Sequence, residues 1–307
     1  MYLLGFNWNP DGTLFKLGFF QLKYYNLLWI AAFAVGWIII KRIFLSEKKT
    51  IQQVDSLFIF GLVSIMLGAR LGHVIFYQPE LFSSDPLSIL LPIKTNPKFE
   101  FTGFAGLASH GATIAAIVGV WLYCRKWKDI NMLWLLDRMV IPSAIGACFV
   151  RLGNFFNSEI TGNEVKESFA FAVRFIRDDL HPSRALDMTK ETTVNAAYKA
   201  IENKPEFASI LESIPFRHPA QLYESICYLI LFIILYQLYW KTEKKNKTGF
   251  LFGLFMVGLW TTRFLIEFVK KRQNEFDESL ELLSIGQWLS IPMILVGLYF
   301  MFRPSKQ

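Results

Sequence analysis

Seven long runs of apolar residues are distributed along the chain. An α-helix rises about 1.5 Å per residue, so roughly 20 apolar residues cross a hydrocarbon core of about 30 Å. The runs have about that length and predict membrane-spanning helices at about 25–43, 55–77, 104–124, 132–150, 220–240, 249–269 and 284–302. We therefore expect an all-α polytopic membrane protein.

Polar and helix-breaking residues interrupt some of these runs. The fourth run is the weakest, because it contains Asp137, Arg138 and Pro142. Pro142 and Pro292 predict kinks or local breaks, which are tolerated where neighbouring helices satisfy the freed carbonyl groups. Small residues in or beside the second and third runs predict close helix packing: Gly68, Gly72, Gly103 and Gly106.

Basic residues between the runs predict the orientation in the membrane. If the N-terminus lies outside, the cytoplasmic segments carry thirteen Lys and Arg residues, against seven in the short exterior segments. This excess favours an exterior N-terminus and a cytoplasmic C-terminus. The cluster Lys270-Lys271-Arg272 conflicts locally, although four acidic residues follow it: Glu275, Asp277, Glu278 and Glu281.

The long segment between the fourth and fifth runs predicts a small mixed α/β extracytoplasmic head. Residues Ser168–Phe175 alternate loosely, which is typical of a short strand. Residues Thr192–Glu212 predict one or two surface helices, broken near Pro205. We expect three regions: residues 1–150 with four helices, residues 151–217 with the head, and residues 218–307 with three helices.

Composition agrees with a membrane protein. A hydrophobic content of 53% and a mean hydropathy of +0.34 overrule the two soluble domains that 307 residues would otherwise suggest. The net charge of +7 lies mostly in the cytoplasmic flanks, where contact with anionic lipid headgroups explains it without nucleic acid. The three cysteines stand at no metal-ligand spacing. No cleavable signal peptide is recognisable, so we expect insertion by the first span.

The segment Arg151–Gly162 is the most informative stretch of the chain. It places an arginine, two asparagines, a glutamate and two glycines directly behind an apolar run. Polar groups at the edge of a membrane span are costly unless they pair or bind something. The segment is therefore a candidate active site.

Three further polar clusters lie in or beside the runs: Arg70–His73, Ser109–Gly111 and Arg263–Glu267. Each also has a purely structural interpretation. Residues 263 and 267 are four apart, so the two side chains share a helix face and can neutralise one another. A histidine in an apolar span is more often a hydrogen-bonded packing element than a base.

The combination of these clusters favours a function. Arg70, Arg151 and Arg263 come from different runs, and the spans contain too few carboxylates to pair them all. Unpaired guanidinium groups in lipid require an anionic partner, and the planar fork of arginine suits phosphate oxygens. We therefore expect a phospholipid headgroup as the anion.

Five motifs together carry a resemblance to a known family. The segment Arg151–Gly162 resembles the signature of the bacterial prolipoprotein diacylglyceryl transferases, Gly-Arg-x-Gly/Ala-Asn-Phe-x-Asn-x-Glu-x-x-Gly. The family's other blocks are matched in order by His110-Gly111, His218–Glu224, Arg263–Glu267 and Gly286–Pro292. The resemblance covers roughly residues 20–302.

Four departures from the family pattern stand out. Val150 replaces the usual glycine of the signature, Ala112 stands where a second glycine is common, and Asn26 follows Tyr25 where the family often has glycine. Residues 176–215 also look longer than usual for the head. None of these differences removes a charged or hydrogen-bonding group.

The resemblance implies a reaction. The family transfers the diacylglyceryl group of phosphatidylglycerol to the thiol of the lipobox cysteine in prolipoprotein signal peptides, which yields a thioether and glycerol phosphate. No metal or organic cofactor is implied. The expected partners are phosphatidylglycerol, lipobox signal peptides and membrane lipids. The expected form is a monomeric multi-pass protein of the bacterial cytoplasmic (inner) membrane.

The resemblance also implies residue roles. His110 is the candidate base for the thiol, and Arg151 and Arg263 are the candidates for phosphate binding and leaving-group stabilisation. Glu267 is expected to hold Arg263. The remaining substrate-binding candidates are Asn154 and Glu159, which would orient the headgroup or Arg151, Tyr25 and Gly162, which would shape the site, and Arg70 and Tyr223 as second-tier residues.

Three other classes of protein share some of these features. A transporter or channel for an anionic solute also has charged residues in its spans, but no paired half-repeat is visible here. An intramembrane hydrolase is disfavoured, because the adjacent Ser109 and His110 point about 100° apart on a helix and no Gly-x-Ser-x-Gly elbow is present. A catalytically inactive homologue would retain the same motifs.

Overall fold

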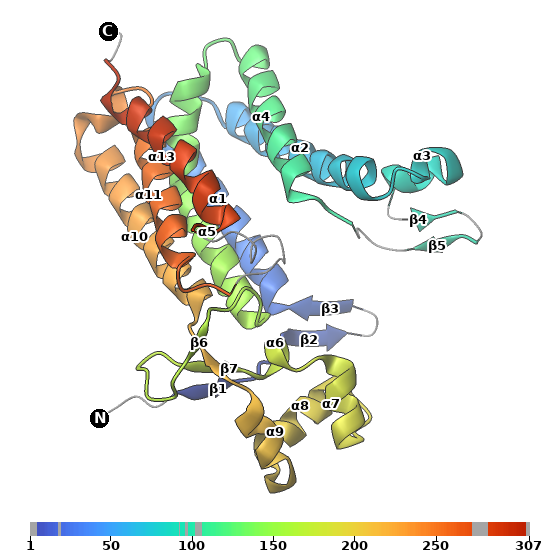
Figure 1. The fold of residues 1–307 in the computed structure, drawn as a ribbon. Coiled ribbons are helices and arrows are strands. Elements are labelled where there is room, and N and C mark those ends of the chain that lie inside the picture. Colours follow the sequence, from blue (N-terminus) through green and yellow to red (C-terminus); the bar gives the residue numbers. More distant parts are fainter. Residues whose placement is uncertain are drawn as a thin grey trace. The chain divides into compact units, whose positions relative to one another are not determined.

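The structure, a computed structural model, describes residues 5–17, 20–91, 93–95, 98–101, 106–271 and 282–304. Long helices make up most of this part of the chain (Figure 1). Gly103, Arg272 and the acidic residues from Glu275 to Glu281 lie outside the described residues, so the expectations for them stay predictions.

A helix lies in each of the seven segments predicted to span the membrane. These helices are α1 (Tyr24–Ser46), α2 (Ile51–Tyr77), α4 (Ser109–Lys126), α5 (Met132–Phe156), α10 (Ala220–Lys241), α11 (Phe250–Ile266) and α13 (Ile285–Phe302). Among the described residues, five of them are long and apolar enough to cross a membrane: α1, α2, α5, α10 and α13. The chain is thus a mostly helical protein with several membrane-capable helices.

The weakest predicted run forms one of these five helices. Helix α5 continues through Pro142, and α13 continues through Pro292. Neither proline therefore causes a local break, which was one of the two predicted effects. Asp137 is buried because its carboxylate accepts hydrogen bonds from the backbone N–H groups of Gly249, at 2.6 Å, and Phe252, at 2.8 Å. The acidic residue that weakened the prediction therefore caps α11. Among the described residues, α5 has the lowest hydropathy of the five, and α4 is not one of them.

The contacts divide the chain into two units, residues 40–136 and residues 1–39 together with 137–307. In the first unit, α2 packs closely against α4 at glycines. A Cβ atom at Gly68 would lie 2.5 Å from the carbonyl oxygen of Gly111, and one at Gly72 would lie 2.7 Å from the Gly111 Cα atom. The predicted packing role of Gly68 and Gly72 is confirmed.

Short elements connect α2 to α4 in the same unit. They are α3 (Leu81–Ser84), the 3₁₀ helix η1 (Pro86–Ile89), and the antiparallel pair β4 (Ile93–Lys94) and β5 (Glu100–Phe101). Gly106 has a φ of +72°, and a Cβ atom there would lie 2.4 Å from the ring of His73. Gly106 therefore packs against a side chain of α2.

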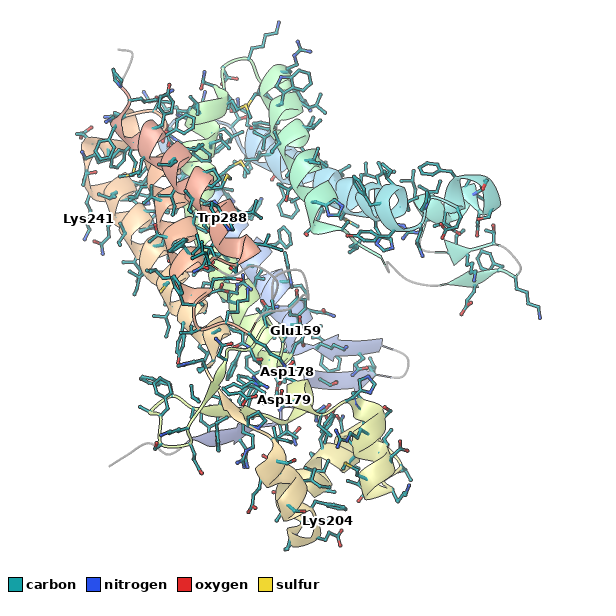
Figure 2. The ribbon with its side chains drawn as sticks, in the orientation of Figure 1. Glu159, Asp178, Asp179, Lys204, Lys241 and Trp288 are labelled. Carbon is teal, nitrogen blue, oxygen red and sulfur yellow. The ribbon has the colours of Figure 1, made fainter. Side chains whose placement is uncertain are left out.

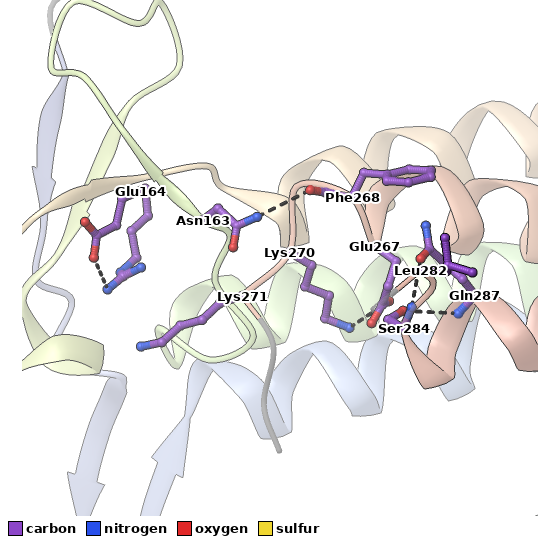
Figure 3. Close-up of a pocket in the computed structure, with 10 residues that line it drawn as sticks. Asn163, Glu164, Glu267, Phe268, Lys270, Lys271, Leu282, Ser284 and Gln287 are labelled. Atoms are coloured by element: carbon purple, nitrogen blue, oxygen red, sulfur yellow. Dashed lines mark hydrogen bonds and ion pairs between the residues drawn. The ribbon is translucent and has the colours of Figure 1, made fainter. Parts of the chain in front are cut away.

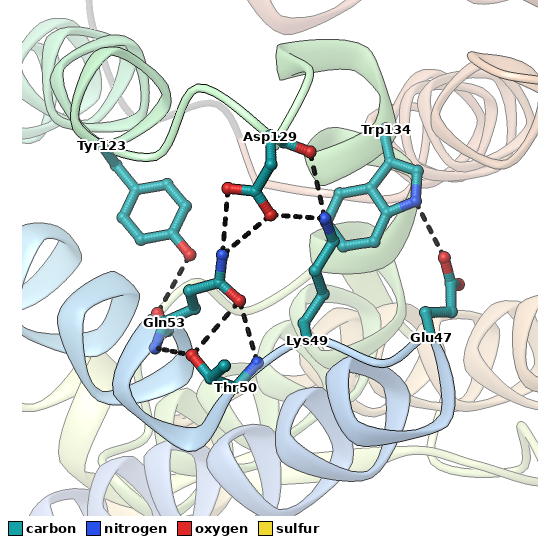
Figure 4. A network of polar contacts seen from close by, with 7 residues as sticks. All are labelled: Glu47, Lys49, Thr50, Gln53, Tyr123, Asp129 and Trp134. Carbon is teal, nitrogen blue, oxygen red and sulfur yellow. Dashed lines mark hydrogen bonds and ion pairs between the residues drawn. The ribbon is translucent and has the colours of Figure 1, made fainter.

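A polar network fixes the start of α2 (Figure 4). Thr50 and Gln53 form a capping box, and the Gln53 amide donates to Asp129 at 3.0 Å. The Lys49 ammonium makes an ion pair with Asp129 at 2.7 Å. The hydrogen bonds from Lys49 and Gln53 lower the pKa of Asp129, so its carboxylate stays charged and binds the segment between α4 and α5.

The second unit contains a four-stranded sheet in the order β1-β7-β8-β6. Its strands are β6 (Glu164–Val165), β7 (Val173–Phe175), β8 (Phe216–Arg217) and, from the N-terminal segment, β1 (Phe6–Trp8), which pairs parallel with β7. The predicted strand over 168–175 is shorter than expected, because the N–H of Phe169 bonds the carbonyl of Lys166, and Ala172 bonds Phe169, in successive turns. A separate hairpin joins β2 (Thr13–Leu17) to β3 (Phe20–Lys23).

Short helices lie between β7 and β8 in the sequence, and we call them, together with the four-stranded sheet, the head. They are α6 (Ile176–Asp179), α7 (Pro182–Thr189), α8 (Val194–Asn203), the 3₁₀ helix η2 (Pro205–Phe207) and α9 (Ala208–Ser213). The break near Pro205 is confirmed, since the chain leaves α8 before it. The helices enclose a small apolar core with Ile176, Tyr198 and Ile201 at its centre. A further 3₁₀ helix, η3 (Glu243–Asn246), links α10 to α11.

Ion pairs hold the sheet to the elements around it. The buried guanidinium of Arg217 binds Asp179 at 2.6 Å and Glu164 at 3.3 Å. Lys271 lies 3.5 Å from the same Asp179 carboxylate, which Figure 2 places between the helices and the rest of the head. Thr161 donates to Asp178 at 2.6 Å. The head is therefore bonded directly to the segments that leave α5 and α11.

Candidate active site

The segment Arg151–Gly162, called the signature segment below, begins in the last turns of α5 and continues beyond its end. Arg151 directs its Nε toward α10, where it forms an ion pair with Oε2 of Glu224. Its Nη1 also donates to Oδ1 of Asn154 at 3.4 Å. The side chains of Arg151 and Glu224 are only 14% and 1% exposed. A buried pair of this kind holds each charge in one geometry.

The chain turns sharply after α5. Ser158 and Ile160 adopt the left-handed conformation, with φ of 55° and 60°. The N–H of Glu159 bonds the carbonyl of Asn154 at 2.9 Å, and the Asn157 amide donates to the Glu159 carboxylate. On the α10 side, the Gln221 amide donates to the Glu159 carbonyl at 2.5 Å. Both asparagines of the signature segment therefore hold the turn that carries Glu159.

Gly162 joins three segments that are far apart in the sequence. Its N–H bonds the carbonyl of His218 at 2.9 Å, and the residue forms a β-bridge with Lys270. A Cβ atom at this position would lie 2.5 Å from Cβ of His218 and 2.6 Å from the carbonyl oxygen of Val269. Only glycine fits there without displacing backbone.

Two aromatic residues among the predicted substrate-binding candidates lie beside these elements. Tyr25 of α1 packs on Gly153, where a Cβ atom would lie 2.7 Å from the tyrosine ring. The hydroxyl of Tyr223 lies 3.2 Å from Nδ1 of His218. Burial lowers the pKa of His218, which favours its neutral ring.

Glu267 and Lys270 follow the end of α11 (Figure 3). Oε2 of Glu267 lies 3.8 Å from Nζ of Lys270. The Glu267 carboxylate also contacts the first turn of α13, where a Cβ atom at Gly286 would lie 2.8 Å from its Cδ. The partly positive N-terminus of α13 stabilises this carboxylate. Glu267 was expected to hold Arg263. Among the described residues, the ion pair of Glu267 is with Lys270, and Nε of Arg263 is buried without a hydrogen-bond partner.

These charged groups form one cluster. Lys270 interacts electrostatically with Glu267, Glu224, Arg151 and Arg263. The buried Tyr228 of α10 interacts with Glu224 and both arginines as well. We call the five residues Arg151, Glu224, Arg263, Glu267 and Lys270 the charged cluster. It contains three cations and two carboxylates, so it can attract and hold an anion.

A cavity of about 550 Å³ opens at one side of the charged cluster. Glu267 and Lys270 line it, together with Asn163 and the capping residues Ser284 and Gln287 of α13. Burial lowers the pKa of Lys270, whereas the nearby Glu267 carboxylate acts in the opposite direction. The cavity therefore contains a buried ammonium group next to a carboxylate.

Two of the predicted site residues belong to the other unit. The guanidinium of Arg70 donates hydrogen bonds to backbone carbonyl groups: Nε to that of Ile89 at 2.9 Å, and Nη2 to that of Ser88 at 2.5 Å. His110 lies in the first turn of α4 with an exposed ring, which meets the ring of Phe76 edge-on at 4.9 Å. Arg70 thus stabilises the connection after α3, and His110 is free to meet a ligand.

Sequence reasoning gave no role to three members of this arrangement: Glu224, Lys270 and Tyr228. Glu224 appeared only as the last residue of the polar run His218–Glu224, which opens α10 and matches a family block. Its burial beside Arg151 depends on the packing of two helices whose residues are more than 70 positions apart, so the local pattern contains no signal for it. A basic residue three positions after a glutamate, as at Lys270, was the one available hint.

Comparisons with known proteins identify the family of the chain. The family model described as prolipoprotein diacylglyceryl transferase matches residues 12–303. The phosphatidylglycerol–prolipoprotein diacylglyceryl transferase of Bacteroides fragilis is 38% identical, over 99% of this chain and 97% of the relative. Enzymes of the same name from Tolumonas auensis and Porphyromonas gingivalis are 35% and 34% identical, over 98% and 97% of this chain and 98% and 94% of the relatives. The chain therefore belongs to the prolipoprotein diacylglyceryl transferase family.

Proposed function

We propose that this protein is a phosphatidylglycerol–prolipoprotein diacylglyceryl transferase. The observation that carries the proposal is the charged cluster, in which arginines from α5 and α11 are held beside carboxylates with positive charge in excess. Phosphatidylglycerol brings a phosphodiester with one negative charge to such a site. The names of the relatives supply the acceptor, a prolipoprotein.

The proposed step is a substitution at a glycerol carbon. The acceptor thiol loses its proton, because the thiolate is the reactive form. A sulfur–carbon bond then forms as the carbon–oxygen bond to phosphate breaks, and glycerol phosphate leaves with the electron pair. Negative charge gathers on the phosphate in the transition state, where Arg151 and Arg263 would stabilise it. His110 is the proposed proton acceptor.

The other site residues would support this step. Glu159 and Asn154 would orient Arg151 and the glycerol of the headgroup, and Tyr25 would shape the lipid side of the pocket. Gly162 would keep the end of α11 close to the signature segment. Arg70 and Tyr223 are proposed as indirect contributors.

The proposed setting is the bacterial cytoplasmic membrane, with seven spanning helices, an exterior N-terminus and a monomeric chain. The charged cluster lies at the C-terminal ends of α5 and α11 and at the N-terminal ends of α10 and α13. In an alternating helix bundle these four ends share one side. In the proposed orientation that side is exterior, where the cysteine of a translocating signal peptide emerges. The head would lie on the same side.

The test is transfer of labelled diacylglycerol from phosphatidylglycerol to a lipobox peptide by the purified protein. Replacing Arg263 by Ala is expected to lower kcat about 10²–10³-fold, since this is the typical effect of losing one donor to developing charge. The matched control is Arg184→Ala, which removes an exposed arginine of α7 in the head. Ion flux without diacylglyceryl transfer would favour a transporter. An Arg263→Ala variant that keeps both full transferase activity and full lipid binding would exclude the role given to Arg263.

A further inference from the structure

Lys270 is a buried cation whose ion pair in the described part of the chain, with Glu267, is a long one. Its side chain is 8% exposed, and its Nζ lies 3.8 Å from Oε2 of Glu267, which is longer than a hydrogen bond. Figure 3 shows the side chain directed along the cavity toward Glu267. The next residue, Lys271, also lines the cavity, but its side chain points the other way, pairs with Asp179 and is 48% exposed. An ammonium group has three donors, and Lys270 lines the cavity, where a ligand can accept hydrogen bonds from it.

The balance of charge in the cluster depends on Lys270. Arg151 and Arg263 together match the two carboxylates of Glu224 and Glu267, so these four groups have no net charge at neutral pH. The ammonium of Lys270 then gives the cluster one positive charge. One phosphodiester monoanion would neutralise the cluster completely.

We propose that Lys270 is the third phosphate-binding cation of this site, with its ammonium donating to a phosphate oxygen of the diacylglyceryl donor in the cavity beside Glu267. The inference rests on the proposed function and adds a residue to it. Of the three cations of the charged cluster, Lys270 is the one that lines the cavity, so it would supply positive charge on the side from which the phosphate enters.

The same group contributes during the reaction. As the carbon–oxygen bond breaks, the departing phosphate changes from a monoanion to a dianion. Lys270 donates a hydrogen bond to the phosphate oxygen that gains this negative charge, without transferring a proton. Glu267 keeps the ammonium group in place. A charge-assisted bond of this type is worth about 1.5–3 kcal/mol, which corresponds to roughly a 10–100-fold effect on binding.

The first experiment changes the charge of the cluster in two steps. Binding of fluorescent phosphatidylglycerol to the purified full chain is measured for Lys270→Met, for Lys271→Met, and for the double variant Lys270→Met with Glu267→Gln. Lys270→Met should bind about tenfold more weakly or worse, and Lys271→Met within about twofold of the parent. The double variant restores one net positive charge and should recover most of the binding.

Each outcome of this experiment decides something. A double variant that binds no better than Lys270→Met overturns the charge assignment, as does unchanged binding in Lys270→Met. Parallel titration with free glycerol phosphate separates the lipid from a soluble anion. If Lys270→Met lost affinity for free glycerol phosphate but kept its affinity for phosphatidylglycerol, a contact between Lys270 and the donor lipid would be contradicted. Failure of the unmodified protein to transfer diacylglycerol would instead reject the proposed function.

The second experiment uses pH. The charged groups that face Lys270 are Glu267, Glu224, Arg151 and Arg263. Burial has the largest effect on the pKa of Lys270. Burial lowers the pKa of Lys270, so its positive charge is lost as pH rises through that lowered value, whereas an arginine keeps its charge. The ratio of kcat/KM between the parent and Lys270→Arg should therefore fall between about pH 7 and about pH 10.

Taking the ratio cancels ionisation of the acceptor thiol, because both proteins use the same peptide. A ratio that stays flat over this range would contradict a charged role for Lys270. Inactivity of Lys270→Arg at every pH, with normal thermal unfolding, would also contradict it and would point to packing. The Lys271→Arg variant serves as the control, for which a flat ratio is expected.

Discussion

At the scale of single residues, the site depends on charges that are buried in pairs. The Arg151–Glu224 ion pair joins α5 to α10 and is almost shielded from solvent. Such a pair contributes little net stability compared with apolar packing, but loss of one partner leaves the other charge uncompensated. Glu224 therefore fixes the orientation of the Arg151 guanidinium.

Replacing Glu224 by Gln should lower the free energy of unfolding by about 3–5 kcal/mol, because Arg151 then keeps its charge without the carboxylate. Transfer activity should fall with it, as Arg151 loses its orientation. Thermal unfolding in detergent micelles measures the first effect and the lipobox peptide assay the second. Glu206→Gln, at a 63% exposed side chain in the head, should shift stability by less than about 0.5 kcal/mol. Equal stability of the two variants would contradict this role.

Gly162 offers a second test at this scale, with an internal control. Gly162→Ala should reduce both stability and transfer, since the added methyl group meets backbone carbonyls at less than 3 Å. Gly146→Ala in α5 adds the same methyl group where nothing lies within 4 Å, and should stabilise the helix by up to about 1 kcal/mol. Thermal unfolding and the transfer assay are compared for both. A Gly162→Ala protein that behaves like Gly146→Ala would show that the segments can separate without cost.

At the scale of helices and strands, glycines set how closely the helices pack. Gly253 of α11 and Gly297 of α13 face one another, and a Cβ atom at Gly253 would lie 2.6 Å from the Gly297 carbonyl oxygen. This contact fixes the separation of the two helices whose ends carry Glu267 and Gly286. The same principle operates between α2 and α4.

Replacing Gly253 by Leu should separate α11 from α13, and the loss of stability should be at least about 1–3 kcal/mol, as for other overpacked contacts. Because Glu267 packs on the first turn of α13, the KM for phosphatidylglycerol should rise as well. Gly61→Leu, in open space on α2, is the control. Normal unfolding together with normal KM in Gly253→Leu would contradict the idea that this contact positions the site.

At the scale of the whole molecule, the sequence predicted the helices better than the connections between them. Apolar runs of about 20 residues are strong local signals, so a helix was correctly expected in all seven segments. The family motifs predicted roles for Arg151 and Arg263, which stay predictions. Strand β1 was not predicted, because three residues have no detectable pattern and their partner β7 lies more than 160 positions away. The ion pairs of Glu224 and Lys270 were missed for the same reason, since they depend on helix packing.

The N-terminal strand provides a prediction at this scale. Trp8 stacks on Phe155 of the signature segment with ring centroids 4.3 Å apart, and its Nε1 donates to the Phe155 carbonyl at 2.9 Å. Trp8→Ala should therefore lower stability by about 3–5 kcal/mol and reduce transfer, although Trp8 is far from the charged cluster in sequence. Trp8→Phe, which keeps the stacking, should be milder. If Trp8→Ala unfolds and transfers like the parent, the strand does not support the site.

The left-handed turn after α5 has one more consequence. Ser158 and Ile160 hold a backbone conformation that costs about 1–3 kcal/mol at a residue other than glycine, and a β-branched residue such as isoleucine tolerates it least. Glycine at both positions would remove that cost but would give the unfolded and open chain many more conformations. The formed turn is therefore strained. Because non-glycine residues restrict the open chain to few other conformations, forming the turn loses less conformational entropy. Glu159 is therefore presented in one position before any lipid arrives, and the energy needed to order it is spent during folding instead of during catalysis.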